Sequence, residues 1–80
     1  MEQMVYDQDK VDDFTLALMS LVFHRDKDAT RAWKGFDWET LDRLYEKGMI
    51  SNPKGRARSV LITEEGLKKS EKLFRELFGK

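Results

Sequence analysis

The stretch that decides the fold is KGMISNPKGRARSVLITEEG, residues 47–66. It contains two short apolar runs, MI and VLI, on either side of a loop rich in the turn formers Asn, Pro and Gly. Residues 49–50 and 58–62 are therefore predicted to form a two-stranded β-hairpin. Lys54, Arg56 and Arg58 lie at its tip. Two interpretations of the tip are open: a basic wing that contacts nucleic acid, or a soluble turn whose charges keep strand edges from pairing with other chains.

Helices are predicted on both sides of this hairpin. Apolar residues recur at helical spacing over residues 38–47, with Asp37 as the N-cap and Gly48 as the left-handed residue that ends the helix. After the hairpin, Thr63 is the predicted N-cap of a terminal helix that continues to Phe78. The side chains predicted to be buried on this helix are Leu67, Ser70, Leu73, Phe74, Leu77 and Phe78.

A third helix is predicted at residues 9–23, with Asp9 as its N-cap. It carries one apolar stripe and, well around its circumference, a second apolar set formed by Leu16, Met19 and Phe23. A helix that is apolar around most of its surface must be covered on two sides. The second set is therefore predicted to lie at a self-association surface, with core packing within the chain as the alternative. The first stripe consists of Val11, Phe14, Leu18, Leu21 and Val22.

The segment between the first two helices, residues 24–35, has mixed charges and no clear period. It is predicted to be a connection with one turn of helix over residues 29–33. Trp33, Phe36 and Trp38 follow within six residues and are predicted to pack in the core, because three large aromatic side chains provide much apolar area in a small protein. Stacking on unpaired bases or binding of an apolar ligand is the functional alternative.

The order of helix, basic hairpin and LITEEG resembles the recognition helix and wing of winged-helix transcriptional regulators of bacteria. The whole chain also resembles a family of small bacterial proteins classed as a domain of unknown function. The resemblance rests on AWKGFDW, LDRLYEKGMIS and LITEEGL, at residues 32–38, 41–51 and 61–67. It implies an α+β, winged-helix-like fold with three main helices and one two-stranded hairpin. It implies no activity and no site residues.

Length and composition indicate a single domain over residues 1–80. A chain of 80 residues buries only about 60% of its unfolded surface, and the sequence has no cysteine for a disulfide. Packing between chains is therefore a source of added stability, and a homodimer is expected. The most apolar stretch, residues 14–23, is shorter than the roughly 20 residues that a membrane helix needs, so we expect a cytoplasmic protein.

The charges are balanced, with 15 basic and 15 acidic side chains, whereas domains dedicated to nucleic acid usually carry a basic excess. They are unevenly distributed, because residues 1–13 are acidic and residues 54–58 basic. These two segments are expected to attract each other, within a chain or between chains. The exposed face of the helix over residues 38–47 is also net negative, with Glu39, Asp42 and Glu46 against Arg43 and Lys47.

Catalytic and metal-binding chemistry is not predicted. The chain has one histidine, His24, with Asp26 and Asp28 in the same segment and no second imidazole, and it has no Gly-rich phosphate loop. We therefore expect no enzyme activity and no cofactor. The favoured function is a non-catalytic protein–protein interaction or self-associating module. The alternative is a DNA-binding winged-helix regulator that uses the basic residues of segment 51–59.

Overall fold

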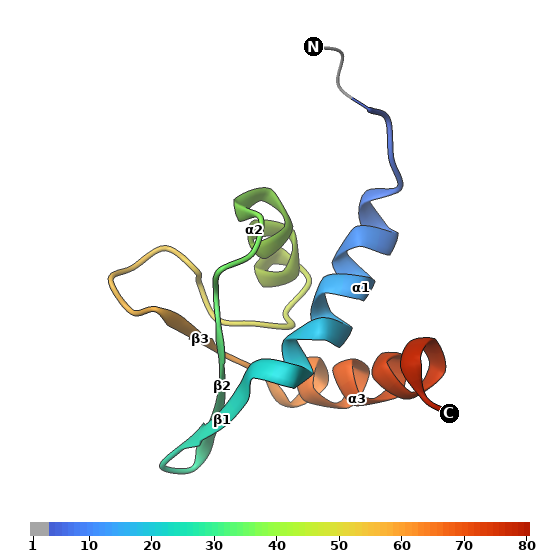
Figure 1. Cartoon of the computed structure of the whole chain (residues 1–80). Helices are drawn as coiled ribbons and strands as arrows, with labels where there is room; N and C mark the ends of the chain where they lie inside the picture. The colour runs from blue at the N-terminus through green and yellow to red at the C-terminus, as the bar shows by residue number, and fades with distance from the viewer. Residues whose placement is uncertain (1–3) are drawn as a thin grey trace.

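The computed structural model describes residues 4–80, which form three α-helices and a three-stranded antiparallel sheet in the order β1-β2-β3 (Figure 1). The predicted α+β class is confirmed. Residues 1–3, which include Glu2 of the acidic segment, lie outside the described residues. The elements are α1 (Gln8–Met19), the short 3-10 helix η1 (Ser20–Val22), β1 (Phe23–Asp26), β2 (Ala29–Trp33), α2 (Trp38–Glu46), β3 (Ser59–Leu61) and α3 (Glu64–Phe78).

Side-chain caps fix where each α-helix begins. The Asp37 carboxylate accepts a hydrogen bond from the Thr40 amide, and the Thr63 hydroxyl accepts one from the Gly66 amide at 2.9 Å, so both predicted N-caps are confirmed. The predicted N-cap of α1 is wrong. Asp7 takes this position instead, where its carboxylate accepts from the Lys10 amide at 3.1 Å.

The segment predicted as an irregular connection forms a β-hairpin. β1 and β2 pair from Phe23 opposite Ala32 to Asp26 opposite Ala29, and a two-residue turn joins them. Lys27 adopts the left-handed conformation there, with φ at 58°. The hairpin forms because side chains alternate between the two faces of a strand, which places Phe23 and Ala32 against the core. The prediction of a helical turn over residues 29–33 is therefore wrong.

β2 is the central strand and also pairs with β3. Ala32 lies opposite Val60, whereas Ile50 contributes only an isolated bridge to Ile62. The predicted two-stranded hairpin of residues 49–50 and 58–62 is therefore replaced by a three-stranded sheet, because β2 offers β3 a longer ladder than residues 49–50 do. Residues 51–58 leave the sheet as a projecting loop, which is yellow to orange in Figure 1.

The core lies between the three helices and one face of the sheet. The hydroxyl of buried Ser70 on α3 donates to the Leu16 carbonyl oxygen of α1 at 2.7 Å, which locks these two helices together. On the opposite sheet face, His24, Trp33 and Leu61 are exposed. The sheet is therefore covered on one side and open on the other. The buried core residues are Leu16, Met19, Ala32, Leu41, Leu44, Ile50, Val60 and Ile62.

Candidate functional site

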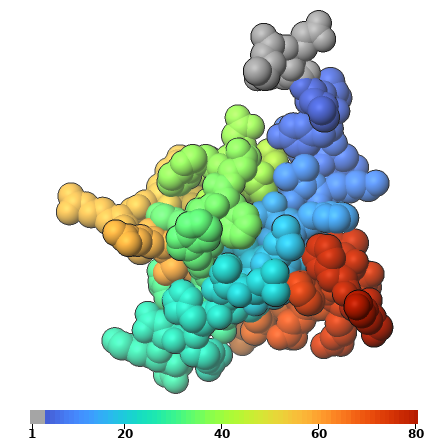
Figure 2. Space-filling view, viewed as in Figure 1, coloured from blue at the N-terminus to red at the C-terminus, as the bar shows by residue number. Residues whose placement is uncertain are grey.

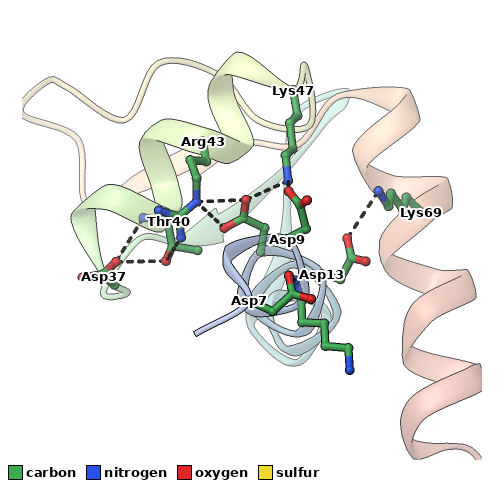
Figure 3. Close-up of polar contacts among 10 residues, drawn as sticks. Asp7, Asp9, Asp13, Asp37, Thr40, Arg43, Lys47 and Lys69 are labelled. Carbon is green, nitrogen blue, oxygen red and sulfur yellow. Dashed lines mark hydrogen bonds and ion pairs between the residues drawn. The ribbon is translucent and has the colours of Figure 1, made fainter. Parts of the chain in front are cut away.

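A buried carboxylate joins α1 to α2. The Asp12 side chain is fully buried, and its two oxygens accept from Arg43 Nε at 2.8 and 3.0 Å (Figure 3). Lys47 Nζ donates to Asp12 at 2.8 Å and to Asp9 at 2.9 Å. Of the two basic residues expected on an exposed helix face, Arg43 is half-buried in this contact, whereas Lys47 is exposed. Asp9 and Asp12 of the acidic segment pair with α2, and Asp13 pairs with Lys69 on α3, as Figure 3 shows for Asp9 and Asp13. Among residues 4–80, no ion pair joins this segment to the basic loop.

The same contacts shift the protonation equilibria of the partners. The hydrogen bond from Lys47 and its positive charge lower the pKa of Asp9. Hydrogen bonds to Asp12 and then to Asp9 raise the pKa of Lys47 against the opposing effect of burial. Burial opposes the charged form of Arg43 as well, but the hydrogen bond to Asp12 raises its pKa. All three groups are held in their charged forms, so the cluster is a structural clasp between two helices.

Metal-binding geometry is not found in the described part of the chain. Within residues 4–80, no three His, Cys, Asp or Glu side chains are grouped closely enough to hold a metal ion. His24, the sole histidine of the sequence, is exposed on β1. In the same residues, no helix has the length and apolar character needed to cross a membrane.

The basic tip predicted from the sequence is exposed. Lys54, Arg56 and Arg58 all lie on the surface of loop 51–58, and within residues 4–80 none of them takes part in an ion pair. Lys34, which the sequence reasoning did not single out, anchors this loop. Its ammonium donates to the carbonyl oxygens of Pro53 at 2.8 Å and Gly55 at 3.0 Å.

Two of the three aromatic side chains predicted to be core residues are exposed instead. Trp33 is 54% exposed and Trp38 59% exposed, while Phe36 packs against the core. Trp33 follows buried Ala32 and therefore points to the open face of the sheet. Trp38 begins α2, where its ring lies 5.8 Å from the Lys34 ammonium.

The segments that carry these aromatic and basic residues lie side by side. The Lys34 amide donates to the Arg58 carbonyl oxygen at 3.1 Å, and Trp33 pairs with Ser59 in the sheet. Figure 2 shows the green segment that contains residues 33–38 next to the yellow and orange loop. We call this region the aromatic–basic surface. Its residues are Arg31, Trp33, Lys34, Trp38, Lys54, Arg56 and Arg58.

The residues predicted to form a self-association surface are not available for one. Leu16 and Met19 are fully buried in the core of the chain, and Phe23 packs against that core. The structure corrects this prediction because α2 and α3 pack against α1 and enclose Leu16 and Met19 in the core of the chain. In the other apolar stripe Phe14, Leu18 and Leu21 are exposed, Leu21 to 68%, whereas Val11 and Val22 are half-buried.

The exposed stripe continues from α1 onto α3. The rings of Phe14 and Phe78 meet edge to face with centroids 6.2 Å apart, and Phe78 makes a similar contact with Phe74 at 5.3 Å. We call this region the α1–α3 apolar face. Its exposed members are Phe14, Leu18, Leu21, Leu77 and Phe78.

The geometry defines a small α+β protein with two candidate binding surfaces, one apolar and one aromatic and basic. The chain belongs to the family described as "Domain of unknown function (DUF6429)", whose model matches residues 7–80. It is also 51% identical over 75 residues to "Uncharacterized protein y4hR" from Sinorhizobium fredii (strain NBRC 101917 / NGR234). That match covers 94% of this chain and 97% of the relative. No solved structure matches the chain.

Proposed function

We propose that the protein is a non-catalytic module that self-associates through the α1–α3 apolar face. The observation that carries this proposal is the joining of two exposed apolar stripes, one from each helix, by the contact between Phe14 and Phe78. Scattered exposed apolar side chains are normal, but a contiguous apolar surface marks an interaction site. Next to it, α1 carries a shallow hollow lined by Lys10, Val11, Phe14, Thr15 and Leu18.

A second copy of the chain is the proposed occupant of this face. Two-fold association places the same patch on both sides, so an apolar patch can cover itself. The formal net charge is zero, and two copies therefore approach without net repulsion. A domain of 80 residues also has a limited core of its own, and added burial between copies stabilises it.

Duplex DNA binding is the alternative function, and the exposed basic side chains of loop 51–58 support it. The winged-helix relationship is likewise a proposal, supported by the succession of α2, the basic loop and α3. Two observations oppose both. Exposed Glu39 and Glu46, with half-buried Asp42, give α2 a negative face where a groove-reading helix needs basic side chains. In addition, the β1–β2 hairpin occupies the place of the helix that precedes a recognition helix.

Sedimentation velocity over a range of micromolar concentrations tests the self-association. We expect a dimer whose population grows with concentration, and we expect Leu21→Glu to produce a monomer with an unchanged circular dichroism spectrum. Leu61→Glu is the matched control, because Leu61 is also exposed but lies on the open face of the sheet. A parent protein that is monomeric throughout, or a Leu21→Glu variant that still dimerises, would overturn the proposal.

A further inference from the structure

We infer that the aromatic–basic surface binds single-stranded nucleic acid. Tryptophan is highly buried on average in folded proteins, yet Trp33 and Trp38 each expose more than half of their surface. Trp33 lies on β2 and Trp38 begins α2, whereas the members of the α1–α3 apolar face come from α1, η1 and α3. Neither tryptophan is therefore a member of the proposed self-association face.

Positive charge lies next to both rings. The Lys34 ammonium is 5.8 Å from the centre of the Trp38 ring and is hydrogen-bonded to the loop that carries Lys54 and Arg56. On the open sheet face, Arg31 lies two residues from Trp33, and its Nε donates to the Ser59 hydroxyl at 2.6 Å. A surface of this kind offers ring faces for nucleobases and cations for the adjoining phosphates.

The acidic residues nearby restrict the path of the nucleic acid. Asp37 already caps α2 through the Thr40 amide and hydroxyl. Asp42 and Glu46 line a small hollow together with Lys54, on the side of the loop that faces α2. A phosphate chain is therefore expected to follow the outer side of the loop and the open sheet face, and to avoid the part of α2 that carries Asp42 and Glu46.

The chemistry favours a single strand over a duplex. In a duplex the faces of the bases are covered by their neighbours, so exposed tryptophan rings have nothing to stack on. In a single strand every base offers a ring face, and aromatic stacking works with any sequence. Trp and Arg are also enriched at protein–protein interfaces, so a protein partner is the competing explanation that the experiment must separate.

Fluorescence anisotropy with a labelled oligothymidylate and a length-matched mixed-sequence duplex tests the inference. We expect the full chain to bind the single strand more tightly than the duplex and to lose affinity as salt is added. Trp38→Ala should weaken binding about tenfold without changing the salt dependence, because it removes stacking and leaves the phosphate-binding cations in place. Trp38→Phe should restore most of the affinity.

Removing positive charge should change the salt dependence of binding as well as the affinity. The double variant Arg56→Gln, Arg58→Gln should weaken binding and also reduce the slope of log affinity against log salt by about 0.7 for each phosphate that is no longer neutralised. The charge-matched control is Lys72→Gln, Arg75→Gln on α3, far from the loop (Figure 1). Absence of binding at low salt, equal affinity for duplex and single strand, or full binding by Trp38→Ala would overturn the inference and assign the tryptophans to a protein partner.

Discussion

The Asp12 carboxylate on α1 and the Arg43 guanidinium on α2 lie 2.8 Å apart, although the Asp12 side chain has no contact with solvent. A buried charge is tolerated only when it is paired and hydrogen-bonded, and Asp12 meets this condition through Arg43 and Lys47. The two helices are therefore held in register by a polar contact at the edge of an apolar core.

Removal of this carboxylate should destabilise the fold. We expect Asp12→Ala to lower the free energy of unfolding by about 2–3 kcal/mol, because Arg43 loses its carboxylate partner and Lys47 keeps only its exposed contact with Asp9. The effect should be smaller than for a fully buried pair, since the Arg43 and Lys47 side chains are 18% and 34% exposed and can still reach water. Asp13→Ala is the control. Its pair with Lys69 at 3.3 Å has side chains that are 37% and 42% exposed, and we expect a decrease under about 0.5 kcal/mol in urea denaturation.

The Lys47 contacts should make the free energy of unfolding depend on pH. The lowered pKa of Asp9 means that its stabilising effect is present above the ordinary aspartate value of 3.8 and is lost as the pH falls through the lowered pKa. The raised pKa of Lys47 means that its contribution is complete below 10.5 and is lost as the pH rises through the raised pKa.

We expect Lys47→Met to return the pKa of Asp9 toward the ordinary aspartate value, because it removes the hydrogen bond and the charge that lower it. An NMR titration of the Asp9 carboxyl carbon measures this change. Lys72→Met is the control, since Lys72 pairs only weakly with Glu76, at 3.9 Å on α3. An Asp9 titration that is the same in Lys47→Met and the parent would contradict the assignment.

Two glycines should respond differently to alanine. A Cβ on Gly66 would overlap the Met49 carbonyl oxygen, because the two backbone segments approach closely there. We expect Gly66→Ala to cost at least about 2 kcal/mol of unfolding free energy. Gly48 has φ at 78° with open space around its Cβ, so Gly48→Ala should cost only about 1 kcal/mol of backbone strain. Chemical denaturation of both variants measures the difference, and an equal decrease in stability would contradict the contact at Gly66.

Substitutions in the two apolar stripes should have different effects, one on stability and the other on self-association. Leu16 is fully buried, and we expect Leu16→Ala to lower the unfolding free energy by about 2–5 kcal/mol. Leu21 is mostly exposed, so Leu21→Ala should change the stability of a dilute, monomeric sample by less than about 0.5 kcal/mol while weakening self-association. Thermal melts at low concentration, paired with sedimentation, distinguish the two effects. Similar decreases in melting temperature in both variants would show that the stripes are misassigned.

Much of the fold could be predicted because its signals are local. Asp37, Thr63 and Gly48 act on amides within three residues or on their own backbone, so their roles follow from the sequence near them. The helical period of α2 is equally local, and its predicted range differs from Trp38–Glu46 by one residue.

The errors arose where long-range packing decides the outcome. Both stripes of α1 are apolar, and only the position of the sheet and α3 determines that Leu16 is buried and Leu21 exposed. The β1–β2 hairpin lacked a turn signal, because Lys27 adopts a positive φ without glycine or asparagine at that position. The partners of Asp12 are 31 and 35 positions away in the chain, beyond the reach of any helical spacing.

The candidate binding surfaces also combine features that local sequence predicts with features that depend on long-range packing. The exposure of Lys54, Arg56 and Arg58 could be predicted from turn chemistry, because a projecting loop leaves its side chains in water. The exposure of Trp33 could not, since its direction depends on the register with β3 and on the burial of Ala32. The anchoring role of Lys34 requires the loop to fold back on β2, which no local pattern encodes.

The anchoring of loop 51–58 by Lys34 lowers the entropic cost of binding a ligand to this loop. Because the Lys34 ammonium fixes the carbonyl oxygens of Pro53 and Gly55, the backbone there is ordered before a ligand arrives. The cost of immobilisation on binding is then confined largely to long side chains such as those of Arg56 and Arg58. Lys34→Met should not slow folding or the association of a ligand with the loop. It should weaken any complex at the loop by returning conformational freedom to the unbound state.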